Sequence, residues 1–152
     1  MSTDSEPHFL EVLYKDLALA LGDAVWAFAR IEWVVYEYIR RLSKDRMDEL
    51  IGEVAFRPRC SILTRLVERR ASLPAKERAI RAIKHAEKLA DRRNIIVHNP
   101  WQVWIDIDAE KFMTEIQKYS SPGRKLDLSE LKRFIEEATR TEKELKESLN
   151  AL

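Results

Sequence analysis

The sequence predicts an all-α fold, an up-and-down bundle of four to five helices with a short β-hairpin before the last helix. Hydrophobic residues make up 45% and charged residues 35% of the 152 positions, and only three are glycine, which is typical of helix-rich soluble proteins. Apolar residues recur every three or four positions over several long stretches, which indicates amphipathic helices. One shorter stretch alternates apolar with polar residues, which favours a strand. The length fits one domain over residues 1–152.

The first long helix is expected over residues 7–42, because an apolar stripe at helical spacing runs through this whole segment. A stripe of this length exceeds what one small neighbouring helix covers. This helix therefore needs several packed helices or a partner subunit. Two shorter helices are expected over residues 47–54 and 60–71, with a proline-containing segment between them.

The next helix is expected over residues 74–98. It ends where Asn99 precedes Pro100, because a residue before proline avoids helical geometry. Residues 101–107 alternate in polarity and predict a strand, paired as a hairpin with residues 112–119.

The last helix is expected to begin at Leu128. Asp127 and Glu130 have the spacing of a capping-box variant, in which each side chain binds the backbone N–H of the other residue. Neither an internal repeat nor a low-complexity segment interrupts these elements, so the whole chain is expected to form the one bundle.

The net charge of +1 conceals a strong segregation along the chain. Residues 57–93 carry twelve Lys or Arg against four Asp or Glu, a balance of +8, whereas the remainder carries −7. Such a basic segment attracts phosphate backbones. Four of its side chains share a polar face of the 74–98 helix and are candidate RNA-binding residues: Arg78, Arg81, Lys88 and Arg92. The alternative is a solvated face whose cations pair with acidic neighbours.

Three residues at the end of this helix, Arg93, Asn94 and His98, are the candidate catalytic residues. A guanidinium can neutralise a phosphate, an amide can orient it, and an imidazole can move a proton. Arg93 falls in the apolar arc, so it must meet a carboxylate, a carbonyl or an open cleft, because a buried unpaired guanidinium is costly. His98 lies one turn after Asn94, so their side chains are neighbours. The alternative role of His98 is a cap on the last carbonyls of the helix.

The pattern Arg93-Asn94-x-x-x-His98 resembles the motif of the HEPN superfamily, small all-helical domains of many prokaryotic ribonucleases, toxins and RNA-processing factors. The resemblance extends loosely over the long first helix, the middle helices and the closing helix. It implies a homodimer in which two motifs face one another in a cleft and cut RNA without a metal. His98 would then activate the ribose 2′-hydroxyl or protonate the leaving oxygen. Arg93 would stabilise the transition-state charge, and Asn94 would orient the phosphate or the imidazole.

The function implied by this resemblance is a metal-independent endoribonuclease in defence, stress response or toxin activity, with an antitoxin or regulatory protein as a further partner. One toxin branch carries a Tyr two residues after the His that its partner modifies. This chain has Pro100 there, which puts that form of control in doubt. Two other interpretations stay open. One is a non-catalytic HEPN-like module that binds RNA or protein, and the other is a helical interaction protein in which Arg93 and His98 are structural.

Glu32 lies in a segment where some members of the HEPN superfamily carry an acidic residue, but a surface or helix-pairing carboxylate is the favoured interpretation. Other classes of protein lose support. Cys60 is the sole cysteine, which excludes an internal disulfide and favours a reducing, cytoplasmic setting. Motifs for a di-metal bundle, a phosphate-binding loop or a serine hydrolase are absent, so no metal or cofactor is expected. Neither a membrane span nor a signal peptide is expected.

Overall fold

The computed structural model describes residues 9–45, 47–70, 72–106, 108, 111–118, 123 and 125–152. Within this part, the helices follow one another in the order α1 (Phe9–Leu42), α2 (Met47–Leu50), α3 (Phe56–Arg70), α4 (Leu73–His98) and α5 (Leu128–Asn150). Between α4 and α5 the chain forms three antiparallel strands, β1 (Trp101–Asp106), β2 (Lys111–Gln117) and β3 (Lys125–Asp127). The expected helical bundle with a hairpin before its last helix is confirmed.

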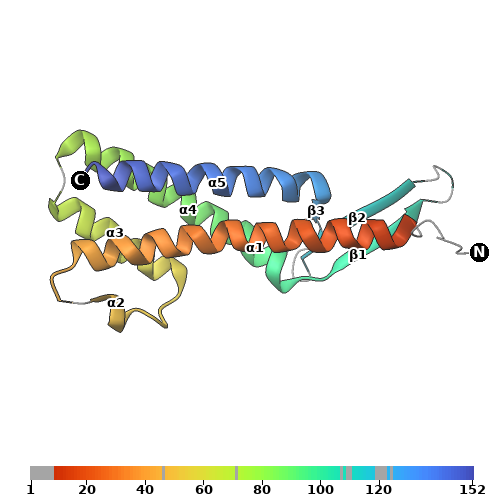
Figure 1. Cartoon of the computed structure of the whole chain (residues 1–152), viewed down its shortest axis with the longest axis horizontal. Coiled ribbons are helices and arrows are strands. Elements are labelled where there is room, and N and C mark those ends of the chain that lie inside the picture. Colours follow the sequence, from red (N-terminus) through yellow and green to blue (C-terminus); the bar gives the residue numbers. More distant parts are fainter. Residues whose placement is uncertain are drawn as a thin grey trace, which may run out of the picture.

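The helices lie along the long axis of the molecule (Figure 1). α1 and α5 run side by side, and α3 and α4 lie behind them. The strands lie at the same end of the molecule as the start of α1, whereas α2 lies near its other end. α4 contacts α1, α3 and α5, so the end of α4 is positioned by the bundle core.

Within the described residues, two helix boundaries differ from the sequence prediction by more than one residue. α3 begins at Phe56 rather than at residue 60, because the Phe56 ring packs edge-on against Phe28 at 5.1 Å between centroids. Pro58 is tolerated there because the N–H groups of a first turn have no partner within the helix. The helix expected over residues 47–54 is confined to Met47–Leu50, and turns follow it at Gly52, a poor helix former.

The expected hairpin is confirmed as an antiparallel pair, with Trp101 of β1 opposite Ile116 of β2. β3 was not predicted, because three residues are too few to show an alternating pattern. It places Leu126 opposite Ile116, and both side chains are buried. This pair joins the sheet to the bundle core. The predicted strand ends at residues 107 and 119 lie outside the described residues.

Phe28 of α1 lies at the centre of the core. Its ring is 5.1 Å from that of Phe56 on α3 and 6.5 Å from that of Phe134 on α5, measured between centroids. Leu89 and Ile96 of α4 are buried in the same cluster. Burial of each such side chain contributes about 1.5–3 kcal/mol. The four long helices therefore share one core, and Phe28 is also where the candidate site begins.

Candidate functional site

The end of α4 is fixed by Asn99. The chain leaves the helix there with extended backbone angles, φ −127° and ψ 140°, as a residue before Pro100 should. The Asn99 side-chain amide donates to the carbonyl oxygen of Ile95 at 2.9 Å, which satisfies one of the last acceptors of the helix. Among the described residues no hydrogen bond of His98 is found, so the structure offers no sign that His98 caps this helix.

Arg93 turns inward, onto α1. Its Nη2 donates to Oε1 of Glu32 at 2.7 Å, and its guanidinium carbon lies 4.9 Å from the centroid of the Phe28 ring. The side chain of Arg93 is 24% exposed and that of Glu32 is 33% exposed, so the ion pair is half-buried but open to solvent on one side. Glu32 is therefore the carboxylate that an arginine in an apolar arc needs.

The guanidinium of Arg93 keeps donors to spare. It has five N–H groups, and within the described residues the only hydrogen bond found for it is the one to Glu32. Its Nε is buried and has no hydrogen-bond partner in that part of the chain. Glu32 and the Phe28 ring hold the plane of the guanidinium in place, while its other donors can bind the oxygens of an anion.

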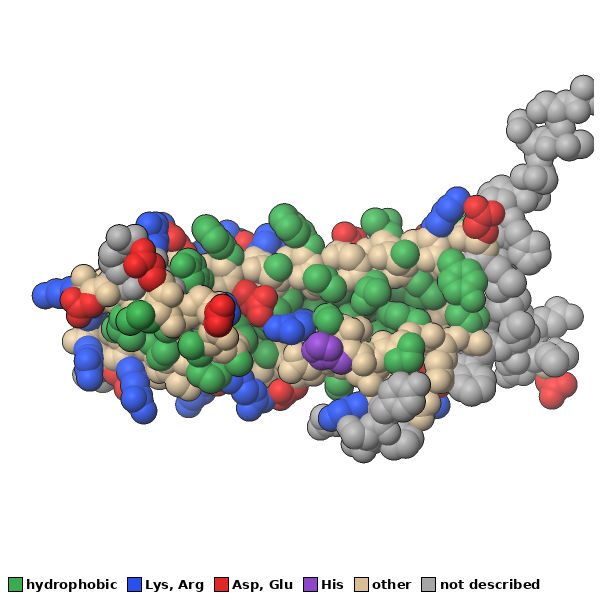
Figure 2. All heavy atoms as spheres, turned by 90° about the horizontal axis from the view of Figure 1, so that it is seen from below, with side chains coloured by type: hydrophobic (Ala, Val, Ile, Leu, Met, Phe, Trp, Pro, Cys, Tyr) green, Lys and Arg blue, Asp and Glu red, His purple; other side chains and the backbone are tan. Residues whose placement is uncertain are grey.

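Asn94 and His98 lie on a different side of α4 from Arg93. Both are exposed, and as residues four apart on a helix they are neighbours. Arg93 and His98 are five residues apart, about 7.5 Å along the helix axis, and about 140° apart around it. In Figure 2 one face of the molecule shows a histidine beside basic and acidic side chains, with apolar side chains around them. One bound phosphodiester could contact both residues only from the edge of α4 that lies between them.

Two of the four candidate RNA-binding residues are engaged by α5. Nη2 of Arg78 donates to the carboxylate of Glu147 at 3.0 Å. Arg92 is half-buried, forms an ion pair with Glu137, and lies with its guanidinium carbon 5.4 Å from the centroid of the Phe134 ring. These two cations hold α4 against α5, in agreement with the alternative interpretation of the basic face.

Arg81 and Lys88 differ from these two. Both are exposed, and no ion pair or hydrogen bond of either is found within the described ranges. They lie between Arg78 and Arg92 along the same side of α4. A phosphate backbone that binds this face would therefore contact Arg81 and Lys88 without having to break an existing ion pair.

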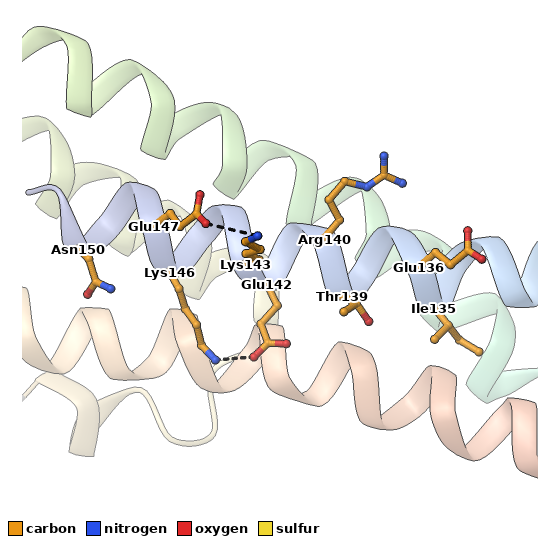
Figure 3. Close-up of a pocket in the computed structure, with 9 residues that line it drawn as sticks. All are labelled: Ile135, Glu136, Thr139, Arg140, Glu142, Lys143, Lys146, Glu147 and Asn150. Atoms are coloured by element: carbon orange, nitrogen blue, oxygen red, sulfur yellow. Dashed lines mark hydrogen bonds and ion pairs between the residues drawn. The ribbon is translucent and has the colours of Figure 1, made fainter.

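Two surface hollows lie away from the motif. One, of about 710 Å³, is lined by residues of α5, where Glu142 accepts a hydrogen bond from Lys146 and Glu147 pairs with Lys143 (Figure 3). The other, of about 530 Å³, lies between α3 and α4 and is lined in part by Arg57, which binds the carboxylate of Asp91. None of the residues predicted for the site lines either hollow.

Glu32 is the residue that sequence reasoning undervalued. Its one signal is indirect: an arginine in an apolar arc demands an acidic partner, and Glu32 lies one turn after Phe28, at the edge of the core face of α1. From the sequence alone, several other carboxylates of the chain could equally be the acidic partner of Arg93. The packing of α4 on α1 selects Glu32 among them.

Comparisons of the chain with protein-family models, curated proteins and solved structures found no match. None of the helices in the described part is long and apolar enough to cross a bilayer. In the same part of the chain, no three His, Cys, Asp or Glu residues are grouped as a metal site would group them.

Proposed function

We propose that the chain is a metal-independent endoribonuclease of HEPN type that acts as a homodimer, with Arg93, Asn94 and His98 as its active residues. The observation that carries this proposal is the half-buried Arg93, held on Phe28 by Glu32 at the same helix end as an exposed histidine. The side chain of Arg93 is 24% exposed, so an anion from the solvent can reach guanidinium donors that Glu32 does not use. A phosphate can use those donors while Glu32 keeps the guanidinium in position.

The reaction is a transesterification. The ribose 2′-hydroxyl attacks phosphorus, the bond from phosphorus to the 5′-oxygen breaks, and the products are a 2′,3′-cyclic phosphate and a 5′-hydroxyl. One proton leaves the 2′-oxygen and one reaches the 5′-oxygen. His98 performs one of these transfers and water performs the other. Arg93 stabilises the extra charge on the phosphoryl oxygens in the transition state, and Asn94 orients the phosphate or the imidazole.

Glu32 acts in this proposal as a positioning residue. It contacts the guanidinium of Arg93 and no reacting atom, so its role is to fix the direction from which Arg93 meets the phosphate. Mispositioning of such a group lowers the rate more than it lowers affinity, because the transition state is more sensitive to geometry than the ground state.

The exposed cations of α4 supply a second contact with RNA, on the side of the helix away from the edge between Arg93 and His98. Arg81 and Lys88 are free to bind phosphates, whereas Arg78 and Arg92 must first leave Glu147 and Glu137. A role in defence, stress response or toxin activity and an antitoxin or regulatory partner rest on the motif resemblance alone, and a cytoplasmic location rests on the single cysteine. We retain them as part of this proposal.

A second function, a non-catalytic HEPN-like module that binds RNA or protein, is favoured by two observations. The charge of Arg93 is already neutralised by Glu32 at 2.7 Å, and Arg93 faces a different side of α4 from His98. In such a module Arg93 would hold α4 against α1 through its ion pair with Glu32. The exposed His98 would contact the bound RNA or protein.

The first prediction separates these two functions. His98→Ala is expected to reduce RNA cleavage at least a hundredfold and to leave RNA binding and the melting temperature nearly unchanged, because an exposed general acid or base acts on the transition state. The measurement is single-turnover cleavage of a labelled single-stranded RNA in the presence of EDTA, with the product ends identified. His85→Ala is the matched control, since His85 is also an exposed histidine of α4.

Cleavage that EDTA abolishes, or that His98→Ala leaves at the parental rate, contradicts the nuclease proposal. RNA binding that persists without any cleavage, in the parent and in His98→Ala alike, supports the binding module instead.

A further inference from the structure

The outer face of α1 exposes large apolar side chains at regular spacing. Four of them recur every seven residues, with exposed fractions of 41% to 67%: Val12, Leu19, Trp26 and Trp33. Tyr14 and Val25, on the same helix, are exposed as well. Apolar side chains stand out along the edge of the molecule that α1 forms (Figure 2). α1 is therefore apolar on its outer side as well as on the side that packs in the core.

A helix that exposes a row of large apolar side chains on the side away from its own core is often covered there by a partner. The exposed parts of the two tryptophans alone come to roughly 300 Å², and Val12, Leu19 and Val25 add to this area. Monomeric proteins seldom leave a continuous apolar patch of more than a few hundred Å² in water. Two copies of this patch together would bury roughly 1,000 Å², the lower limit for a specific interface.

Gly22 lies at the middle of this face. Glycine weakens a helix interior, yet within the described residues, the adjoining residues and the nearby backbone of α1 apart, nothing lies within 4 Å of where a Cβ of Gly22 would be. No contact in the described part of the chain therefore explains a glycine halfway along the exposed stretch from Val12 to Trp33. A second helix packed closely against α1 would explain it, because a glycine leaves room for a large side chain of the neighbour.

We propose that the outer face of α1 binds α1 of a second copy of this chain in antiparallel orientation, with Trp26 of each copy seated on Gly22 of the other. A second row of side chains lies three residues after each member of the row formed by Val12, Leu19, Trp26 and Trp33. The second row is Lys15, Gly22, Ala29 and Tyr36. In an antiparallel helix pair the two rows face one another. The facing pairs are Trp26 with Gly22, Leu19 with Ala29, Val12 with Tyr36, and Trp33 with Lys15 of the second copy.

These pairs complement one another in size and charge. The central pairs each join a large residue to a small one, which fills the interface without voids. Of the two outer pairs, that of Trp33 with Lys15 places a lysine ammonium against a tryptophan ring, a favourable cation–π contact. Because the same patch serves both copies, the contact closes as a two-fold dimer.

A parallel pair fits much less well. It would set Gly22 against Gly22 and leave a void beside two tryptophans that meet each other. It would also bring the two Lys15 ammonium groups together, and like charges at one contact repel. The alternation of large and small side chains along α1 thus favours the antiparallel pair.

This dimer would be the assembly of the proposed nuclease, but its interface does not depend on the chemistry of the Arg93 site. The pairing is centred near residue 24, and Glu32 lies about eight residues, or 12 Å, from it. The two Arg93–Glu32 sites are then about 24 Å apart along the helix pair. Each site works alone in this dimer, in contrast to the shared cleft that the resemblance implies.

The second prediction tests the interface. Sedimentation velocity should give a species of twice the 17.9 kDa chain mass at micromolar concentration. Gly22→Leu should raise the dissociation constant of the dimer at least tenfold, because the added side chain fills the space that Trp26 of the second copy would occupy. Its helicity by circular dichroism should be kept, because the protomer has open space at this position and leucine favours a helix. Trp26→Ala should act in the same direction.

Lys132→Leu is the matched control, because it places a leucine on an exposed position of α5, and it should leave the dissociation constant unchanged. A monomeric parent at micromolar concentration overturns the proposal, whether or not the protein then binds vesicles or another protein. A folded Gly22→Leu dimer of parental affinity also overturns it.

Spin labels on Arg41→Cys test the orientation. Arg41 lies 17 residues from the pairing centre, so the two labels should be about 50 Å apart in the antiparallel dimer and below about 20 Å in a parallel one. Cys60 can remain in place, because it is buried and burial raises its pKa to about 12, which keeps it from reacting with the label. A short distance overturns the antiparallel pairing. A dimer with the long distance but no RNA cleavage supports this inference and contradicts the nuclease proposal alone.

Discussion

At the scale of single residues, Arg93 shows how a side chain in an apolar arc can be stable and still reach a ligand. Its charge meets Glu32, its plane rests on Phe28, and a quarter of its surface remains in water. A fully buried pair would cost more in desolvation than it gains. A fully exposed pair would be too loosely held to orient a phosphate. The half-buried position avoids both the full desolvation cost and the loose positioning of the guanidinium.

The third prediction concerns this ion pair. Glu32→Gln should lower the free energy of unfolding by about 1 kcal/mol, because a half-buried guanidinium loses its charged partner but keeps contact with water. It should also lower the rate of RNA cleavage more than RNA affinity, as expected of a positioning residue. Urea unfolding and single-turnover cleavage measure the two effects.

Asp91→Asn is the control for this prediction, because the ion pair of Asp91 with Arg57 is exposed on both sides and should contribute at most a few tenths of a kcal/mol. Equal losses of stability in the two variants would show that the Arg93–Glu32 pair has no special role in the fold.

At the scale of elements, the start of α5 is determined by a local motif. The carboxylate of Asp127 accepts the N–H of Glu130 at 2.7 Å, and the carboxylate of Glu130 accepts the N–H of Asp127 at 2.9 Å. The hydroxyl of Ser129 also donates to Asp127. These hydrogen bonds, first that of Ser129 and then that of the Glu130 backbone, outweigh burial and hold the pKa of Asp127 below its usual 3.8.

The fourth prediction concerns this cap. Asp127→Ala should lower the free energy of unfolding by about 1 kcal/mol at pH 7, because the first turn of α5 loses its acceptor. The pKa of Asp127 is lower in the folded state than in the unfolded chain. Its contribution is therefore complete above about pH 5 and is lost as the pH falls through the folded-state pKa.

Asp127→Asn provides the matched comparison, since asparagine also caps helices but carries no charge. It should keep most of the stability at pH 7 and lose stability less steeply than the parent between about pH 5 and pH 3 in urea unfolding. If Asp127→Asn follows the parent over this whole pH range, the Asp127 carboxylate does not contribute to acid sensitivity.

At the scale of the whole molecule, the segregated charge is partly neutralised by the fold. The +8 segment packs against acidic side chains of α5, and Glu147 and Glu137 bind two of its arginines. Fewer cations than the sequence suggests are therefore available to bind a phosphate backbone, and these include Arg81 and Lys88. The net field of this surface is thus weaker than the sequence alone indicates.

The fifth prediction follows from that difference. The double variant Arg81→Glu with Lys88→Glu should weaken the binding of single-stranded RNA and lower the slope of log affinity against log salt by about 1.4, or about 0.7 for each lost phosphate contact. Fluorescence anisotropy between about 50 and 200 mM salt measures this slope.

The control carries the same change of charge outside the basic segment, at two exposed lysines, Lys44→Glu with Lys132→Glu. RNA affinity that falls equally in both double variants would indicate an effect of net charge and would contradict a binding face on α4.

The helices, the hairpin and the α5 cap could be predicted from the sequence because each depends on residues close together in the chain. Helical spacing of apolar residues, the Asn99-Pro100 stop and the Asp127–Glu130 pair are local signals. The early start of α3 and the strand β3 were missed because they depend on distant partners, Phe28 and Ile116.

For the candidate site, the sequence by itself determined that Arg93 lies in an apolar arc, that Asn94 and His98 lie one turn apart, and that the helix ends beside them. These follow from helical geometry and from the conformational limits of proline. The tertiary structure alone decided that Glu32 pairs with Arg93, that α5 binds Arg78 and Arg92, and that the outer face of α1 stays uncovered in the protomer. The physical reason is that each depends on which helix faces which, and the packing of the shared core sets those neighbours.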